Sequence, residues 1–327
     1  MTKIIDLIQR DLYTTDIILA SDFVRSILDS KIFTSNQKIR NKLASSDVGT
    51  KINIPYVNPD TYSEPSIMDD TTDRLNVDKI TKGEFDARIN YYAKSWGWSE
   101  IASQISAGIK PEVAIGMFLG EYWGKDIKTK TLAMLKGISQ TDTTLDVTSE
   151  NRNLDFATLI DGLDIVGDSD LGKYASLVVH SRVKNNIIKN DNNPYKRVES
   201  ENGIVKETYN GLELLVDDSL PVEADGNGGF NYTSYIVRNG AVVFEKARLS
   251  DGLKSLEYSR DPFAGNGGAT TAIISRMGYL LHPNGFNNKT NPEKVTGMTV
   301  AEFETASNWV RVVSKKQAPT ITIITKG

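Results

Sequence analysis

A long polar stretch between two alternating segments constrains this chain more than any other feature. Residues 51–57, Lys-Ile-Asn-Ile-Pro-Tyr-Val, alternate polar and apolar side chains, and residues 85–96 alternate again. Such alternation predicts half-buried strands, and Pro55 restricts the first of them to a sheet edge because proline has no backbone donor. Between the strands, residues 58–84 carry seven carboxylates against three basic side chains. A loop of this length is unusual inside a compact domain, so we expect a two-stranded excursion that reaches another subunit.

The bulk composition is that of a folded protein and excludes several classes of function. The 327 residues are 39% hydrophobic and 24% charged, which allows two or three sub-domains with a sizeable core. The formal net charge is −4, whereas a protein that holds duplex DNA by its phosphates usually has a basic excess. Cysteine is absent, which excludes disulfides, thiolate metal sites and cysteine nucleophiles. We also expect no membrane span and no secretory signal, because the sequence lacks the unbroken apolar runs that both require.

The rest of the sequence predicts a mixed α+β chain. Residues 1–50 have short apolar stretches broken by polar residues and predict an arm with little core of its own. Pro111 begins a long helix that ends near Lys136. The first half of this helix is apolar on every side, which predicts burial all round, and the charged residues 125–130 predict partial exposure. Other expected helices are 99–108, 154–163, 181–188 and 300–309, and expected strands are 175–179, 212–216, 270–274, 278–282 and 320–324.

Asn239-Gly240 is the strongest short hairpin signal in the chain. Asparagine and glycine both tolerate the positive φ angles of a tight type I′ turn, and residues 233–237 and 241–244 on either side are apolar. We therefore expect these two segments to pair with each other.

One acidic motif resembles a metal site. Asp69, Asp70 and Asp73 match the Asp-Asp-x-x-Asp pattern that holds magnesium in prenyl-transfer enzymes, where the motif sits on a helix. Here Pro65 and two threonines surround it, inside the polar stretch. We interpret the motif as a solvated acidic loop and keep a metal-dependent hydrolase or transferase built on the three aspartates as an alternative.

The other candidate motifs favour structural roles. The glycine-rich stretches 226–229 and 265–271 lack the lysine and spacing of a phosphate loop and predict turns with positive φ. His180 and His282 are far apart in sequence, with no third ligand at a suitable spacing. Asp217-Asp218 follows a strand, where such residues usually start a turn or cap a helix. The sequence thus predicts no catalytic, cofactor-binding or metal-binding residue, and no enzyme.

Several segments in order resemble one family of viral proteins. The chain resembles the major capsid protein 13-like family of tailed phages, which has the capsid fold named after phage Hong Kong 97, the HK97-like fold. The match covers nearly the whole length. The segments that carry the resemblance are residues 50–56, Tyr122-Trp123, 132–138, 179–181, 209–212, 216–221, Arg260-Asp261-Pro262-Phe263-Ala264-Gly265-Asn266-Gly267-Gly268, Arg276, His282-Pro283-Asn284-Gly285-Phe286 and 308–312.

The resemblance implies an order of domains. It implies an N-terminal arm over 1–50, an extended-loop hairpin over 51–98, a first part of the peripheral domain with the spine helix over 99–150, an axial domain over 151–259 and returning peripheral strands over 260–327. It also implies self-assembly as pentamers and hexamers into an icosahedral head that encloses double-stranded DNA without binding it specifically. The expected location is the virion capsid, assembled in the host cytoplasm, and the expected partners are other copies, a separate scaffolding protein, a portal and decoration proteins.

Two points of the resemblance stay open. An encapsulin, a cellular shell of the same fold that encloses an enzyme, is an alternative reading. The founding member of the fold also cross-links a loop lysine to a neighbour's asparagine. Lysines and asparagines are available here, but we find no local signature of that reaction and do not predict it. The available residues are Lys51, Lys79, Lys82, Asn287 and Asn288.

Overall fold

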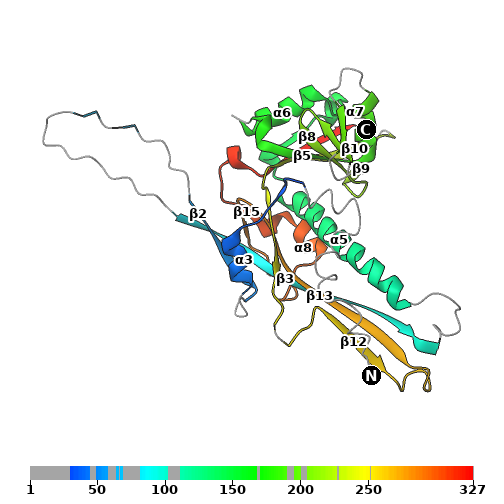
Figure 1. The fold of residues 1–327 in the computed structure, drawn as a ribbon. Coiled ribbons are helices and arrows are strands. Elements are labelled where there is room, and N and C mark those ends of the chain that lie inside the picture. Colours follow the sequence, from blue (N-terminus) through cyan, green and yellow to red (C-terminus); the bar gives the residue numbers. More distant parts are fainter. Residues whose placement is uncertain are drawn as a thin grey trace.

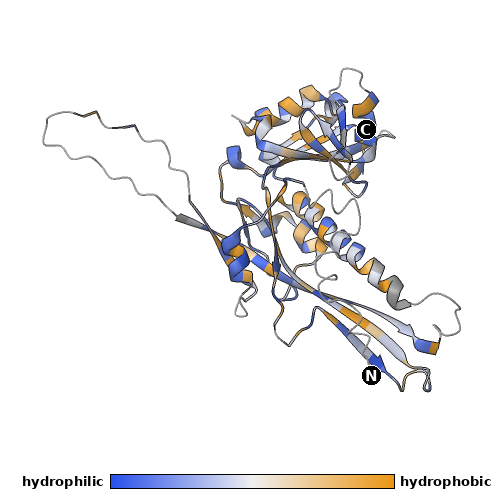
Figure 2. Cartoon of the chain, viewed as in Figure 1, coloured by the Kyte–Doolittle hydropathy of each residue, from blue (hydrophilic) through white to orange (hydrophobic). Residues whose placement is uncertain are grey.

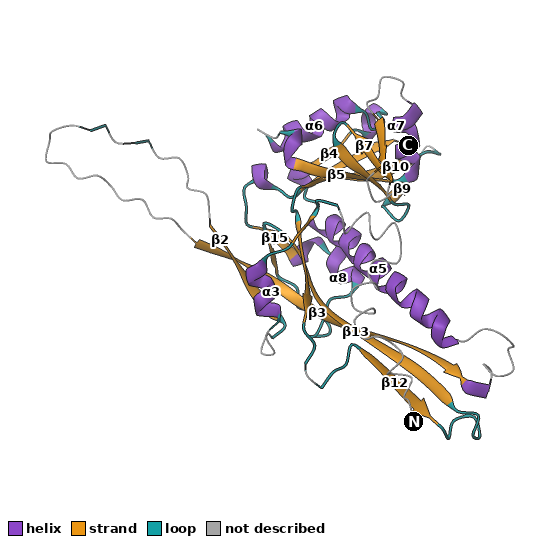
Figure 3. Ribbon diagram, in the orientation of Figure 1, coloured by secondary structure: helices purple, strands orange, loops and turns teal. Residues whose placement is uncertain are grey.

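The computed structural model describes most of the chain. The described residues are 30–44, 49–57, 64–65, 67–68, 82–101, 111–167, 170–189, 195–199, 205–226, 228–250 and 252–326. They form two large sheets with a long helix beside them, the mixed α+β class that the sequence predicts (Figures 1 and 3). Among the described residues, no helix combines the length and apolarity that crossing a bilayer requires.

The first sheet has six strands and contains the base of the excursion. Its order is β1-β11-β13-β3-β2, with β12 paired to β13. The strands are β1 (Phe33–Thr34), β2 (Lys51–Val57), β3 (Lys82–Ser99), β11 (Val242–Ala247), β12 (Leu256–Asp261) and β13 (Thr270–Pro283). β2 lies at the end of the order, so the edge position that Pro55 predicts is confirmed. The two strands expected at 270–274 and 278–282 are one continuous strand, β13, which pairs with β3, β11 and β12.

The second sheet has eight strands and lies above the first in Figure 1. Its order is β4-β16-β10-β5-β8-β7-β6, with β9 paired to β10. The strands are β4 (Thr144–Asp146), β5 (Tyr174–Val179), β6 (Tyr195–Glu199), β7 (Val205–Tyr209), β8 (Leu212–Val216), β9 (Val222–Ala224), β10 (Phe230–Arg238) and β16 (Thr320–Lys326). A separate pair joins β14 (Phe286–Asn288) to β15 (Trp309–Arg311).

Five helices accompany the sheets in the described residues. They are α3 (Gln37–Leu43), α5 (Pro111–Ile138), α6 (Phe156–Val166), α7 (Ser181–Lys189) and α8 (Val300–Glu304). Thr299 caps α8 with a full capping box, but α8 ends at Glu304, so the helix expected over 300–309 is only half as long, and Trp309 begins β15. The expected helix over 99–108 falls mostly outside the described residues, as do residues 1–29 of the arm and most of 58–81.

The burial of α5 differs from the expectation. Phe118 in its first half is 62% exposed, whereas Lys130, expected to be partly exposed, is 4% exposed. The well-buried part is the second half, which shares one core cluster with Val178 of the second sheet and Leu281 of the first (Figure 2). The reason is position: this half packs in the junction of the two sheets. Apolarity of the sequence alone cannot say which turns of a helix reach such a junction.

The expected hairpin around Asn239-Gly240 is wrong. The turn exists, with Gly240 at φ 67° and the Ala241 amide bonded to the carbonyl of Arg238. However, β10 pairs with β5, β9 and β16, while β11 pairs with β1 and β13. The turn therefore passes the chain from the second sheet to the first. A turn signal specifies the reversal of the backbone, and the long-range partners decide the pairing.

Strand pairing also crosses two of the expected boundaries. β11 lies within the segment 151–259 and β12 spans its end, yet both belong to the first sheet. β16, within 260–327, belongs to the second sheet, where it lies between β4 and β10. Each sheet thus contains segments from distant parts of the sequence.

Candidate assembly surfaces

The residues suspected of chemistry do not form a reactive centre in the described structure. Asp69, Asp70 and Asp73 lie outside the described residues. Among the described residues, no three histidine or acidic side chains come close enough to hold a metal ion. No metal-binding geometry therefore supports the metal-dependent enzyme alternative in the described part of the chain.

The two histidines lie in different environments. His180 follows β5, where its ring contacts Tyr232 and its Nδ1 accepts the amide of Arg182 at 3.0 Å. His282 is fully buried on β13, and its Nε2 lies 2.9 Å from the carbonyl oxygen of Phe286. Burial lowers the pKa of His282 to about 4. Each ring serves its local packing, so the expected structural roles fit this geometry.

Asp217 and Asp218 have the turn and capping roles that their sequence position predicts. The carboxylate of Asp218 accepts the amide of Ser181 at 3.1 Å at the start of α7. Asp217 accepts the amide and hydroxyl of Ser219 and forms an ion pair with Lys128 of α5 at 2.6 Å. The Asp217 side chain is only 4% exposed, so this ion pair is a nearly buried link between α5 and the second sheet. This link could not be predicted from the sequence, because nothing local connects the two positions.

The glycine-rich stretches are turns, as expected. Gly226 and Gly228 have φ of 77° and 87°, and Gly265 and Gly267 have 62° and 89°. Side chains with a Cβ rarely adopt such angles, which explains why glycine stands there.

A buried polar cluster fastens α5 to the first sheet. Nζ of Lys130 lies 2.6 Å from the Asp126 carboxylate and 3.1 Å from the hydroxyl of Tyr279, which itself donates to Asp126. The same ammonium lies 3.3 Å from the centre of the Tyr92 ring. Burial lowers the pKa of Lys130, and burial together with Asp126 raises the pKa of Tyr279. The i, i+4 spacing of Asp126 and Lys130 was visible in the sequence, but their burial was not.

Among the described strands, β2 is paired on one side only, which leaves a strand edge at the base of the excursion. The amide of Ile89 donates to the carbonyl of Thr50, and antiparallel bonding alternates, so the backbone groups of residues 51, 53, 55 and 57 point away from β3. Pro55 is at one of these outward positions, where its missing donor costs no ladder bond. An edge of this kind can pair with an extended segment of another chain.

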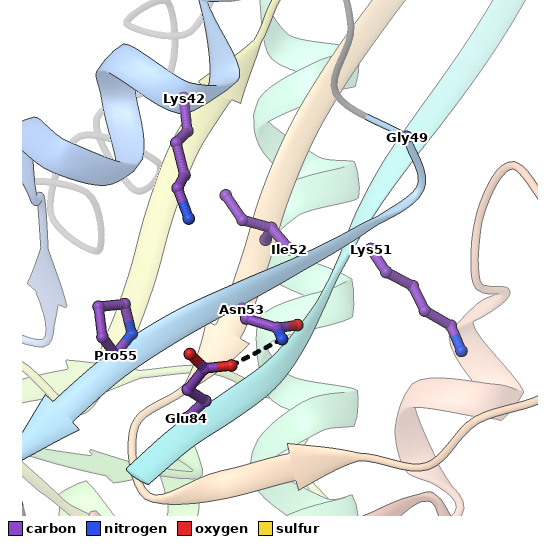
Figure 4. Close-up of a pocket in the computed structure, with 7 residues that line it drawn as sticks. All are labelled: Lys42, Gly49, Lys51, Ile52, Asn53, Pro55 and Glu84. Atoms are coloured by element: carbon purple, nitrogen blue, oxygen red, sulfur yellow. Dashed lines mark hydrogen bonds between the residues drawn. The ribbon is translucent and has the colours of Figure 1, made fainter. Parts of the chain in front are cut away.

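A groove of about 490 Å³ runs along this edge beside α3. In Figure 4, Lys42 of α3 and Lys51 lie on opposite sides of β2, and Asn53 donates to Glu84 at 2.8 Å. The full lining is Lys42, Gly49, Lys51, Ile52, Asn53, Pro55 and Glu84. The mixture of charges and backbone groups suits contact with a polypeptide.

α3 is held next to this edge by a buried carboxylate. Glu245 of β11 accepts the amide of Asn36, the hydroxyl of Ser35 and the guanidinium of Arg40. Its side chain is only 6% exposed. The three donors fix the start of the helix, so the groove has a rigid wall.

Large apolar side chains are exposed at several separate places. The described residues of the excursion include Ile67 at 93% and Met68 at 97% exposure, and Phe263 is 88% exposed. Apolar side chains this exposed cost solvation free energy unless another surface covers them. Together with the β2 edge, they indicate a subunit that buries further surface in an assembly.

Comparison with known proteins gives one significant relative of similar sequence. The chain is 26% identical over 325 residues to the major capsid protein of Bacillus phage SPP1, and the match covers 97% of this chain and 95% of the relative. No model of a known protein family matches the sequence.

Solved structures resemble the whole architecture. The capsid of Ralstonia phage GP4 superposes with a TM-score of 0.60 at 10% identity, covering 90% of this chain and 87% of the other. The SrpI encapsulin of Synechococcus elongatus superposes with a TM-score of 0.51 at 12% identity, covering 99% and 91%. At these identities the structural likeness shows the fold alone.

Proposed function

We propose that copies of this chain, a phage major capsid protein with the HK97-like fold, form pentamers and hexamers. These rings then assemble into the icosahedral head of the phage. One observation carries the proposal. The alignment with the capsid protein of phage SPP1 spans 97% of this chain and 95% of the relative, so the likeness extends over both sheets and α5. We further propose membership of the major capsid protein 13-like family, which the order and spacing of the segments quoted above support.

The domain scheme follows from the resemblance, adjusted by the strand pairing. We propose that residues 1–50 act as an arm and that 51–98 act as the extended loop. The peripheral domain consists of the first sheet with α5, and the axial domain consists of the second sheet. In this scheme β11 and β12 belong to the peripheral domain and β16 to the axial domain, because strands of one sheet share one core.

Partners beyond the chain itself are part of the same proposal. A separate scaffolding protein, a portal and decoration proteins are expected from the resemblance. The formal net charge of −4 supports a wall that encloses DNA without trapping its phosphates.

Shortening the excursion tests the proposal. Replacing residues 59–81 with a short Gly/Ser turn should leave the subunit folded, because β2 and β3 keep their pairing and their shared core with Ile39 and Leu43. It should abolish closed shells or reduce them severely. Circular dichroism reports the fold, and electron microscopy reports the shells.

A finer variant isolates the exposed apolar side chains. The double substitution Ile67→Ser and Met68→Ser removes two side chains that contribute almost nothing to the subunit core. It should leave the melting temperature unchanged and lower the yield of shells. Normal shells from both variants would contradict the role of the excursion in assembly.

An encapsulin remains the second candidate, because the SrpI shell shares the fold. The contents of the particle separate the two functions. Particles purified from infected cells should contain double-stranded DNA, whereas an encapsulin would contain an enzyme. Particles that hold a single co-purifying enzyme and no DNA would favour the cellular shell.

A further inference from the structure

The two edges of the second sheet carry opposite charge. One edge, which we call the α6 edge, comprises the described residues 144–167 and 170 and carries six carboxylates against one arginine. The other, the α7 edge, comprises the described residues 181–189, 195–199 and 205–209 and carries six basic side chains against two acidic ones. α6 itself contains Asp161 and Asp164 and no basic residue, whereas α7 contains three basic residues and no acidic one. The segregation gives one sheet a negative end and a positive end.

The strand order places these edges as far apart as the sheet allows. β4 and β6 are the two outer strands. α6 packs on β4 and β16, and α7 is tied to the opposite half by the ion pair of Lys184 with Glu207 on β7. Figure 1 shows both helices above the second sheet, α6 toward one end of it and α7 toward the other, and both contribute side chains to one core cluster. Five strands separate β4 from β6, so the two edge strands of one copy do not pair with each other.

Each edge also presents apolar side chains that its own core does not use. On α6, Phe156 and Ile160 are 49% and 36% exposed, one turn apart, while Leu159 and Leu163 on the opposite face fill the core. On α7, Ile188 is 43% exposed, next to the buried Ile187. One exposed apolar residue is ordinary. Here exposed apolar residues lie on two helices, and the charged side chains are all acidic in α6 and all basic in α7.

The edge strands resist direct pairing between sheets. β4 is only three residues long, and β6 exposes the charged side chains of Lys196 and Arg197. Short strands and charged edges oppose a continuous ladder between two sheets. Contact between edges would then depend on the side chains of the helices, where charge and apolar surface are both available.

We propose that the α6 edge of one copy binds the α7 edge of a second copy, head to tail around a rotation axis. The proposal rests on the proposed function and names the surfaces that build its rings. A contact between two different patches repeats by rotation and closes into a ring, whereas a contact of a patch with itself stops at a dimer. Opposite charges favour the correct patch, and the like-charged pairings of α6 with α6 or α7 with α7 are repelled.

Cysteine cross-linking tests the contact directly, because the natural chain has no cysteine. Three variants are made: Ile160→Cys alone, Ile188→Cys alone, and a chain that carries both substitutions. Assembled particles are treated with a flexible bis-maleimide and run on a denaturing gel. The doubly substituted chain should give a ladder up to pentamers and hexamers. A mixture of the two single variants should give dimers, and each single variant alone should stay monomeric.

Charge exchange provides the second measurement, independent of cross-linker reach. Asp164→Lys and Lys189→Asp should each lower the yield of shells by about tenfold at low salt, since each places like charges together. The chain with both substitutions should regain most of the wild-type yield. High salt should reduce the defect of the single variants, because ions screen exposed charges.

The outcomes separate this proposal from the proposed function. If the wild-type chain forms no shells under any condition, the proposed function fails. If it forms shells but the mixture of single variants gives no dimers and charge exchange restores nothing, the function stands and the head-to-tail contact is wrong. Dimers from Ile160→Cys alone would instead indicate a two-fold contact and would also overturn the proposal.

Discussion

At the scale of single residues, the ionisation of His282 makes the stability of the folded chain depend on pH. Its folded pKa of about 4 lies below the ordinary value of 6.5, so the folded chain binds fewer protons than the unfolded chain between these pH values. Stability must then be complete above about pH 6.5 and fall as the pH drops toward 4. For a fully buried ring, the loss amounts to about 3 kcal/mol.

Replacing His282 tests this dependence. His282→Gln keeps a donor for the carbonyl of Phe286 but cannot ionise. The variant should lose less stability than the wild type when the pH falls from 7 to 4.5, as measured by urea unfolding at each pH. Equal losses for the two proteins would show that other groups control the acid response.

Trp123 and Phe118 make a matched pair on α5. Trp123 is 2% exposed and its Nε1 donates to the hydroxyl of Ser275 at 2.9 Å, whereas Phe118 is 62% exposed. Trp123→Ala should lower the unfolding free energy by about 3–5 kcal/mol. Phe118→Ala should change it by less than about 0.5 kcal/mol. Thermal or denaturant melting of the unassembled subunits measures both, and similar effects would mean that the helix is rotated from the position described.

The residues also show where sequence reasoning stops. The turn glycines depend on neighbours in sequence and were predictable, whereas the apolar pattern that predicted burial was right for Trp123 and wrong for Phe118. The pairing of Lys128 with Asp217 was not, because 88 positions separate the two residues and only the fold brings them within 2.6 Å.

At the scale of elements, the ion pair of Lys128 with Asp217 couples α5 to the second sheet. Lys128→Met leaves a nearly buried carboxylate without its cation and should cost about 1–3 kcal/mol of stability. Adding Asp217→Asn removes the orphaned charge and should recover part of the loss. A double-mutant cycle measures the coupling. Additive effects would mean that the two groups do not interact in solution.

Periodicity predicted most elements but not their partners. β2, β8 and α7 begin at the expected residues because each has a clear pattern of its own. The hairpin at Asn239-Gly240 failed because local turn chemistry cannot compete with long-range pairing to β16 and β13. The buried second half of α5 was missed for the same reason: its environment is made by two sheets that are distant in sequence.

At the scale of the whole molecule, charge predicts the relation to DNA. The chain has a formal net charge of −4, and phosphate binding requires a concentration of positive charge. At physiological salt we expect no strong affinity of the subunit for duplex DNA. Filter binding or fluorescence anisotropy with a labelled duplex measures this, with a basic DNA-binding protein as the positive control. Sub-micromolar affinity that falls steeply with salt would contradict the expectation.

The fold class and the function could be inferred from sequence because the whole order of segments resembles one family. The surfaces that join subunits could not. They depend on which charges share an edge, and that became visible only when the strand order separated β4 from β6. The absence of any candidate catalytic residue was an inference from motifs, and the suspected Asp69, Asp70 and Asp73 lie where the structure describes nothing.

The crossing of the chain between sheets has a consequence for biosynthesis. β16 occupies the place between β4 and β10, yet it is translated more than 80 residues after β10. While the ribosome is still adding those residues, the second sheet lacks the strand that joins β4 to β10. The apolar partners of Ile321 and Ile323 then face solvent. Domains generally fold as units once their residues have emerged. A nascent or prematurely terminated chain therefore cannot offer a finished surface to its neighbours, which keeps incomplete products out of a growing lattice.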